Sequence, residues 1–527
     1  MINLFDQLFE ISDSADSLDE FLNKNMQAVN EFYNSDYSRI VNCKDSIERF
    51  ILFKHNIIAK LNYAKSYNKS FVLMLLDYCE RLNSRGAIPR IYYILNDNNI
   101  AINSRLQAAL LFSYPEPKTN SEFVDKFDAI CEKLQLAVDT EDDDDSKALA
   151  TFLNYYSIIL NDTSIQFVEQ VKAKLTNAIE NEIYPFLEHS CISEIIQLNL
   201  DDTDNSYVQL QSYIDKILNK KEFVSIEVIV HKEELLIEEN TEYTKELSAV
   251  PAIFDLIRNI SVQKSDGQTN TDRGVKILNS ESELFAYLRR LGNMHKAKLQ
   301  SAFESLPDTF YSKVNVVDWG CGQGIASMIF FEKYGTEIVN EITLIEPSEI
   351  AIKRASLHIK KYNPAILIKT VCKKLDDLTE QDVKKSSIDT TIHLFSNILD
   401  IDDYKQSFLI DLIETTQSNI NYFVCVSPHI DEIKTERLES FKRYFENKYD
   451  SYELLSDIQN SKTTNDFYWN CNSNYKSCKC PEHPLNGCTN QWTRVIKVFK
   501  IEFTNNAPNT KWGVSSISKC NKSGGNY

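Results

Sequence analysis

Apolar residues in the first 220 positions recur every three or four residues, the spacing of one face of an α-helix. Leu18, Leu22 and Met26 begin one such stretch. Similar stretches cover residues 47–61, 71–82, 106–112, 123–136, 148–160 and 165–179. The alternation typical of strands is almost absent here. The pattern therefore predicts a mainly helical domain over residues 1–262, built either as an irregular solenoid or as a helical bundle.

The hydrophobic pattern changes in two steps after the helical region. Residues 223–230 are rich in β-branched residues and favour a strand. A polar stretch with turn-forming residues follows, and we expect a linker at 263–277.

From about residue 278 the pattern alternates between short apolar runs and amphipathic stretches. The runs predict strands at 314–318, 342–346, 365–371, 390–395, 421–426 and 493–500. The amphipathic stretches predict helices at 281–305, 325–334, 348–361 and 404–416. Strands that alternate with helices form doubly wound sheets, and continuous apolar runs suit strands buried on both faces. We expect an α/β, Rossmann-like domain over residues 278–503, after the all-α domain.

Composition narrows the class of protein. The chain has 527 residues, too many for one hydrophobic core. A net charge of −19 disfavours nucleic acid or an anionic membrane surface as a partner, although a local basic face could still bind RNA. The N-terminus lacks a signal peptide, and no apolar run approaches the ~20 residues needed to cross a bilayer. We expect a cytoplasmic protein whose 12 cysteines are thiols or metal ligands.

A glycine turn is the strongest chemical signal. Gly320, Gly322 and Gly324 follow the first predicted strand at Asp318, and they are three of only 12 glycines in the chain. Glycine permits positive φ and lets a ligand approach the backbone, beside the free N–H groups of a helix N-terminus. Glu346 ends the next predicted strand, where a carboxylate can accept hydrogen bonds from both ribose hydroxyls.

The spacing D-x-G-x-G-x-G resembles the first motif of class I S-adenosylmethionine-dependent methyltransferases, and residues 344–347 resemble their acidic second motif. A dinucleotide fingerprint would instead require Gly or Ala at position 325, which is Ile325. The resemblance covers roughly residues 278–503, under half of the chain. It implies a sheet whose last strand, here 493–500, is antiparallel.

The resemblance also implies roles for the matched residues. The three glycines would pass close to the methionine moiety and ribose of the cofactor. Asp318 would order the loop or contact the amino group, and Glu346 would hold the ribose. Asp376 matches the place where the family often contacts the adenine amino group, although it or the adjacent Asp377 could simply cap a helix.

Residues that follow the fourth and fifth predicted strands are candidates for the acceptor side. Ser396 and Asn397 follow the fourth strand, without the Asn/Asp-Pro-Pro-aromatic tetrad of amino-directed nucleic-acid methyltransferases. Asn397 could instead cap the next helix. His429 follows the fifth strand and is a candidate base, or an exposed loop histidine. Tyr287 and His295 are candidates for covering the cofactor, or for packing a helix on the sheet.

A cysteine cluster occupies a polar insertion at 469–490. Cys471, Cys478, Cys480 and Cys488 lie there with spacing C-x6-C-x-C-x7-C. The segment is too polar to build a core, so a tetrahedral zinc site would stabilise it, with an iron–sulfur cluster as second choice. The alternative is a set of reduced thiols. Residues 504–527 are expected to form a polar tail.

The sequence therefore predicts a methyltransferase whose acceptor, whether RNA, protein or small molecule, stays open. The helical domain would recognise a partner or the substrate. Basic residues after the fifth strand alternate with glutamates, which predicts a solvated helix face; they are Lys434, Arg437, Lys442, Arg443 and Lys448. The alternatives are a catalytically silent scaffold acting as an interaction protein and a nicotinamide-dependent oxidoreductase.

Metal analysis tests the cysteine cluster. We expect about one zinc ion per chain in protein purified without chelator, because four thiolates complete one tetrahedral site. Cys478→Ser combined with Cys480→Ser should abolish binding, whereas Cys520→Ser in the polar tail should not. Elemental analysis that finds no metal in the unsubstituted protein would favour free thiols.

Overall fold

The structure is a computed structural model. It describes residues 3–115, 117–139, 145–198, 203–219, 242–265, 276–383, 388–401, 404–416, 418–428, 431–460 and 494–503. The strand expected at 223–230, most of the linker, the cysteine-rich insertion at 469–490 and the polar tail lie outside the described residues.

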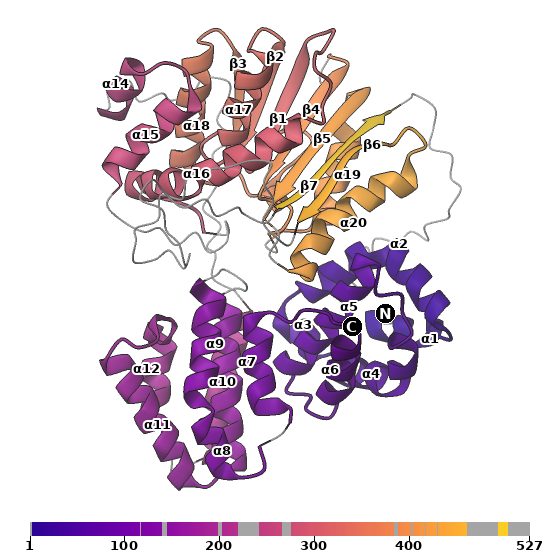
Figure 1. The fold of residues 1–527 in the computed structure, drawn as a ribbon, viewed down its shortest axis with the longest axis vertical. Coiled ribbons are helices and arrows are strands. Elements are labelled where there is room, and N and C mark those ends of the chain that lie inside the picture. The colour runs from indigo at the N-terminus through magenta and orange to yellow at the C-terminus, as the bar shows by residue number, and fades with distance from the viewer. Residues whose placement is uncertain are drawn as a thin grey trace, which may run out of the picture.

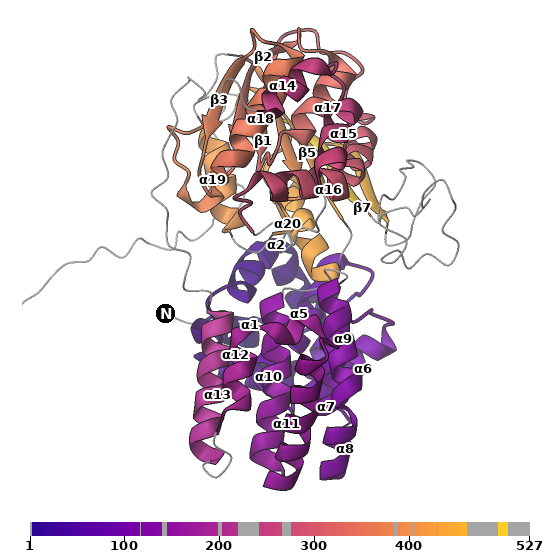
Figure 2. The same cartoon turned by 90° about the vertical axis from the view of Figure 1, so that its left-hand side faces the viewer.

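The N-terminal domain is helical, as the sequence predicts (Figures 1 and 2). Its elements are α1 (Leu4–Ile11), α2 (Ala15–Tyr33), α3 (Tyr37–Val41), α4 (Lys44–Ile58), α5 (Ser66–Arg81), α6 (Ile88–Asp97), α7 (Ser104–Ser113), α8 (Asn120–Asp125), α9 (Phe127–Asp139), α10 (Asp145–Asp162), α11 (Ile165–Glu180), η1 (Pro185–Glu188), α12 (Ser190–Ile196) and α13 (Thr203–Leu218). Side chains fix several starts: Asn3 caps α1 and Ser14 caps α2. The apolar faces merge into one core that extends from Phe5 to Ile214.

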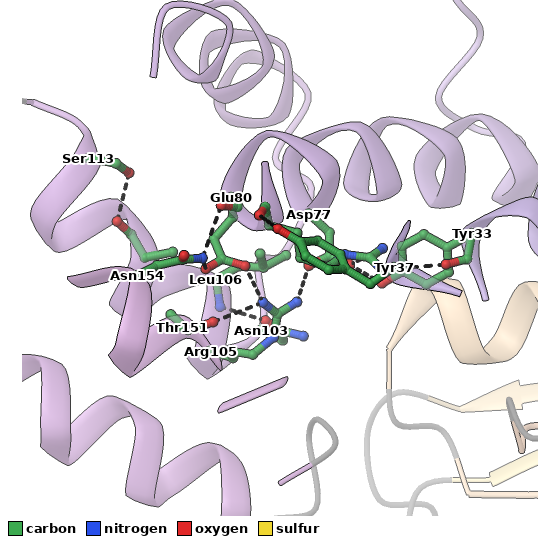
Figure 3. Close-up of polar contacts among 12 residues, drawn as sticks. Tyr33, Tyr37, Asp77, Glu80, Asn103, Arg105, Leu106, Ser113, Thr151 and Asn154 are labelled. Carbon is green, nitrogen blue, oxygen red and sulfur yellow. Dashed lines mark hydrogen bonds and ion pairs between the residues drawn. The ribbon is translucent and has the colours of Figure 1, made fainter. Parts of the chain in front are cut away.

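A buried ion network lies between three helices of this core (Figure 3). Arg105 of α7 pairs with Asp77 and, at 2.8 Å, with Glu80, both on α5. Thr151 and Asn154 of α10 complete the network, the first accepting from Arg105 at 3.1 Å and the second donating to Glu80 at 3.0 Å. Because a buried charge left without its partner is costly, the network fixes how α5, α7 and α10 pack.

The C-terminal domain is a doubly wound sheet of seven strands in the order β3-β2-β1-β4-β5-β7-β6, which confirms the predicted fold class. Its strands are β1 (Val314–Trp319), β2 (Val339–Ile345), β3 (Leu367–Val371), β4 (Thr390–Ser396), β5 (Ile420–Ser427), β6 (Glu453–Asn460) and β7 (Arg494–Glu502). Its other elements are α14 (Glu242–Ala249), α15 (Phe254–Lys264), α16 (Glu281–Phe303), α17 (Ile325–Tyr334), α18 (Glu349–Tyr362), η3 (Leu375–Asp377), α19 (Gln406–Thr416) and α20 (Glu432–Lys448).

The two faces of the sheet bury two separate cores. Successive strand residues point to opposite faces, so Val316 packs in one core and Val317 in the other. Helices α14–α18 cover the first face, while α19 and α20 cover the second (Figure 1). In the described sheet β7 runs antiparallel to both β5 and β6, and the remaining neighbours are parallel.

Helices α14 and α15 pack with the sheet domain. The sequence division at 263–277 groups them with the N-terminal domain, but Tyr243, Leu247, Phe254 and Ile257 lie in the core that also holds β1 and α16. The sequence pattern did not show which core the apolar residues of these two helices enter. The last residues of α15 thus lie inside the range expected to be a linker.

Strand β6 is a further difference from the predicted elements. Its sequence, Glu453–Asn460, mixes charged and apolar residues and has no clear alternation. It pairs only with β7 among the described strands, at the edge of the sheet. An edge strand that is partly exposed on both faces carries little hydrophobic signal, so the sequence pattern missed it.

Helix α20 corrects the expectation of a solvated basic face. Lys434, Glu436 and Arg437 are 8%, 0% and 1% exposed, and buried residues continue from Ile433 to Phe441. The helix lies between the sheet and the helical domain in both views (Figures 1 and 2). The charges in its first half are buried because the two domains cover opposite sides of the same helix, whereas Glu446 and Lys448 near its end are exposed.

Specific contacts join α20 to the helical domain. Glu436 accepts a hydrogen bond from Ser66 of α5 at 2.8 Å and pairs with Arg443 at 2.9 Å. Arg443 also lies over the ring of Tyr67, 4.8 Å from its centroid. Ile433 belongs to the core of the helical domain. The interface thus combines apolar packing with a fully buried carboxylate.

We predict that Glu436→Ala lowers the free energy of unfolding by roughly 3 kcal/mol, since it leaves Arg443 without its buried partner. Chemical denaturation followed by circular dichroism measures this loss. Glu446→Ala, at an exposed position of the same helix, should change stability little. Equal losses in the two variants would contradict a buried charge pair at the interface.

Candidate functional site

The glycine turn between β1 and α17 has the backbone that its sequence predicts. Gly320, Gly322 and Gly324 have φ values of +62°, +51° and +77°, all in the left-handed region that favours glycine. A Cβ on Gly320 would lie 2.8 Å from Ile398, and one on Gly324 would lie 3.2 Å from Ala355. A Cβ on Gly322 would meet nothing within 4 Å. The outer glycines therefore allow tight packing, and the middle one presents bare backbone to open space.

Glu346 lies directly against this turn. Its Oε2 accepts a hydrogen bond from the Gly322 N–H at 3.0 Å, and its Oε1 accepts from the Ser348 N–H at 3.0 Å. Burial raises the pKa of the carboxyl to about 7, against the effect of the two N–H donors. Glu346 is thus held at the carboxyl edge of the sheet, and each of its oxygens can still accept a further hydrogen bond.

Asp318 lies beneath the turn and is fully buried. Its Oδ2 accepts from the Ser327 hydroxyl at 2.6 Å, whereas Oδ1 has no hydrogen-bond partner among the described residues. Burial raises the pKa of Asp318 to about 7. A buried oxygen without a partner is costly, and a bound cationic group would satisfy it.

A buried histidine supports the turn from the other side. His358 of α18 hydrogen bonds through Nδ1 to the Gln323 carbonyl at 2.8 Å. Its Nε2 bonds the Tyr243 hydroxyl at 2.5 Å. Burial lowers the pKa of His358 to about 3, so the ring is neutral and Nδ1 donates to the carbonyl while Nε2 accepts. Helix α14 thereby helps to hold the glycine turn.

The residues after β4 form a second polar cluster. Asn397 has a φ of +57° and donates its backbone N–H to the Val426 carbonyl at 2.7 Å. Its side-chain Nδ2 lies 2.5 Å from His295 Nδ1 and 3.2 Å from the Ser396 hydroxyl, while its Oδ1 accepts from Lys298. The next helix, α19, begins only at Gln406, so these contacts define Asn397 better than a helix cap.

Helix α16 supplies the other half of this cluster. His295 is buried, and burial lowers its pKa well below the usual range, so it is neutral. Its Nδ1 accepts from Asn397, which leaves Nε2–H facing the Tyr287 oxygen at 3.2 Å. Ile398 connects the cluster to the glycine turn through its contact with Gly320.

Lys298 was not predicted from the sequence. It is 2% exposed, and its Nζ donates to Asn397 Oδ1. A lysine within an amphipathic helix is normally expected to face solvent. Only the spacing from His295, three residues earlier and on the same helix face, could have marked it.

The remaining predicted residues are Asp376 and five residues that lie outside the described ranges. Asp376 lies in η3, is exposed and accepts from the Lys405 N–H at 2.9 Å, just before α19. That contact is with the segment before α19, 29 residues further along the chain, and the predicted role of Asp376 in adenine recognition stays a prediction. His429 and the cysteines at 471, 478, 480 and 488 lie outside the described residues. Within the described ranges no group of three or more His, Cys, Asp or Glu side chains could hold a metal ion.

Several solved structures that resemble this chain are methyltransferases. The plantazolicin methyltransferase BpumL, in complex with SAH, is 13% identical; the match covers 50% of this chain and 99% of that one, with a TM-score of 0.26. A SAM-dependent methyltransferase from Leishmania major is 9% identical over 49% and 89%, with a TM-score of 0.26. Geranyl diphosphate methyltransferase is 10% identical over 42% and 83%, with a TM-score of 0.25. No protein-family model matches the chain, and no curated protein does.

The fold is identified from the strand order β3-β2-β1-β4-β5-β7-β6 with β7 reversed, and not from these TM-scores. The C-terminal domain has the class I methyltransferase fold. The glycine turn and Glu346 lie at the carboxyl ends of β1 and β2, the edge at which such sheets bind ligands. In the described part of the chain, no helix combines the length and apolar character needed to cross a membrane.

The pH dependence of stability tests the burial of Asp318. In the unfolded chain this carboxyl ionises near pH 4, whereas in the folded chain it ionises near pH 7. Its contribution to stability is therefore lost as the pH rises from about 4 to about 7 and is constant above that. Relative to Asp318→Asn, the unliganded wild type should lose roughly 2–3 kcal/mol between about pH 5 and 7.

Urea denaturation of both proteins across this range measures the difference. Asp450→Asn, at an exposed turn, should follow the wild type at every pH. If Asp318→Asn also follows the wild type, the carboxyl is not held protonated in the folded state.

Proposed function

We propose that this chain is an S-adenosylmethionine-dependent methyltransferase. The observation that carries the proposal is the Glu346 carboxylate, hydrogen bonded to the Gly322 N–H beside a turn of three left-handed glycines. The bound cofactor would supply a methyl carbon already activated by a sulfonium, so the protein has chiefly to align donor and acceptor.

The groups at the turn fit the parts of that cofactor. Glu346 keeps lone pairs free for two ribose hydroxyls, and bare backbone at Gly322 permits close approach. The free Oδ1 of Asp318 suits the ammonium of the methionine moiety. A positive charge there would also lower the pKa of Asp318 and favour its ionised form.

A dinucleotide cofactor is less well supported. Its fingerprint needs a small residue where the helix packs closely on the strand, and Ile325 occupies that position, 5% exposed in the core. In this chain Gly324, one position earlier, makes the close contact with Ala355 of α18.

The helical domain, we propose, shapes the acceptor side. Helix α20 begins at Glu432, shortly after β5 ends at Ser427, and so borders the edge where the glycine turn lies. The helical domain encloses α20 through Ser66, Tyr67 and Ile433. A partner or substrate bound to that domain could therefore reach this edge of the sheet. RNA, protein and small-molecule acceptors all remain open to experiment.

Calorimetry tests the cofactor assignment. Wild type should bind S-adenosylmethionine, and Glu346→Ala should bind it at least tenfold more weakly, because a hydrogen bond to a charged group contributes about 1.5–3 kcal/mol. Glu349→Ala, at an exposed position of α18, should bind as the wild type does. Binding of NAD without S-adenosylmethionine would indicate an oxidoreductase. No binding of either would indicate a scaffold.

A further inference from the structure

Lys298 is a buried lysine without a carboxylate partner among the described residues. No Asp or Glu of the described residues lies within 4.0 Å of its Nζ, and its hydrogen bond goes to a neutral amide, Asn397 Oδ1. Lys497 offers the contrast within the same domain: it is equally buried, and both Glu439 and Asp457 pair with it. A buried lysine that serves only structure is normally paired in that way.

The surroundings of Lys298 favour the neutral amine. Burial lowers its pKa to about 7, and Asp400 opposes this only in part. Asp400 is itself held by the Ser427 hydroxyl at 2.7 Å. His295, on the same helix, is neutral and adds no charge. Near neutral pH a large fraction of Lys298 therefore carries a lone pair that can take up a proton.

Lys298 is connected to the carboxyl edge of the sheet through Asn397. Its partner Asn397 follows β4, and residues 396–398 are half-buried, unlike the strand before them. Asn397 holds a left-handed backbone, which most residues other than glycine avoid, and the contacts from Lys298 and His295 fix it there. Such strain is common at functional sites. Ile398 then contacts Gly320 of the cofactor turn.

We propose that Lys298 is a catalytic base that takes the proton from an O–H or N–H methyl acceptor. This inference rests on the proposed function, because it requires S-adenosylmethionine as methyl donor. It narrows the acceptor to a nucleophile that must lose a proton.

A lone pair on the acceptor oxygen or nitrogen forms the bond to the methyl carbon, and the carbon–sulfur bond breaks with its electron pair going to sulfur. The proton on the acceptor moves to the neutral Lys298 Nζ, which becomes an ammonium. Water takes that proton once the product has left. Asn397 orients the amine by accepting one of its N–H groups.

Titration of Lys298 by NMR in the full chain tests the proposal without a known acceptor. Protein labelled with [ε-13C]lysine should show one resonance with a midpoint near 7 instead of the usual ~10.4. The resonance should be missing in Lys298→Met and present in Lys296→Met, a control on the same helix whose lysine pairs with Asp255. Asn397→Asp should raise the midpoint by at least one unit, and this identifies the resonance even if Lys298→Met fails to fold.

The two cofactor forms then test proximity to the methyl group. S-adenosylmethionine carries a positive sulfonium and S-adenosylhomocysteine does not, so only the first should lower the midpoint, by about one unit. Equal effects of the two ligands, or a midpoint near 10 in the free protein, would overturn the assignment of Lys298. Absence of any binding heat would overturn the proposed function and this inference with it.

Discussion

The proposed cofactor site depends on one contact, the hydrogen bond from the Gly322 N–H to the Glu346 carboxylate. This hydrogen bond forms because Gly320, Gly322 and Gly324 take positive φ and turn the chain over the carboxyl end of β1. A side chain at Gly320 would collide with Ile398, and one at Gly324 would crowd Ala355. Within the described part of the chain, this turn leaves one oxygen of Asp318 without a partner and open backbone at Gly322. These features make a place for a ligand with ribose hydroxyls and a positive charge.

Two further constraints act on this edge of the sheet. Helix α20 begins just after β5 and is enclosed by the helical domain, so the two domains share one buried helix. A carboxylate buried at that joint, Glu436, would be unfavourable without Ser66 and Arg443 around it. On the other side, α16 brings Lys298 to Asn397. The carboxyl edge of the sheet is therefore bordered by α16 and α20, which lie far apart in the chain. The partners of their buried charged groups are not evident from the local sequence.

Much of the sheet domain could be predicted from sequence, because buried parallel strands are continuous apolar runs and the glycines and Glu346 follow them directly. Strand β6 was missed because an edge strand such as Glu453–Asn460 carries little periodic signal. The polar residues of α20 predicted a solvated face, since burial by a second domain leaves no mark on local spacing. Lys298 was not predicted because its burial depends on a tertiary contact with Asn397, and its spacing from His295 is a weak signal. The predicted roles of Ser396 and Asn397 on the acceptor side remain predictions.

A crystal structure of the full chain with S-adenosylhomocysteine would show directly whether Glu346 and the glycine turn hold the cofactor. We expect both ribose hydroxyls within hydrogen-bond distance of the Glu346 carboxylate, and the ligand's amino group within reach of Asp318 Oδ1. A ligand bound elsewhere, or one that leaves Glu346 without contact to the ribose, would contradict the proposed cofactor site.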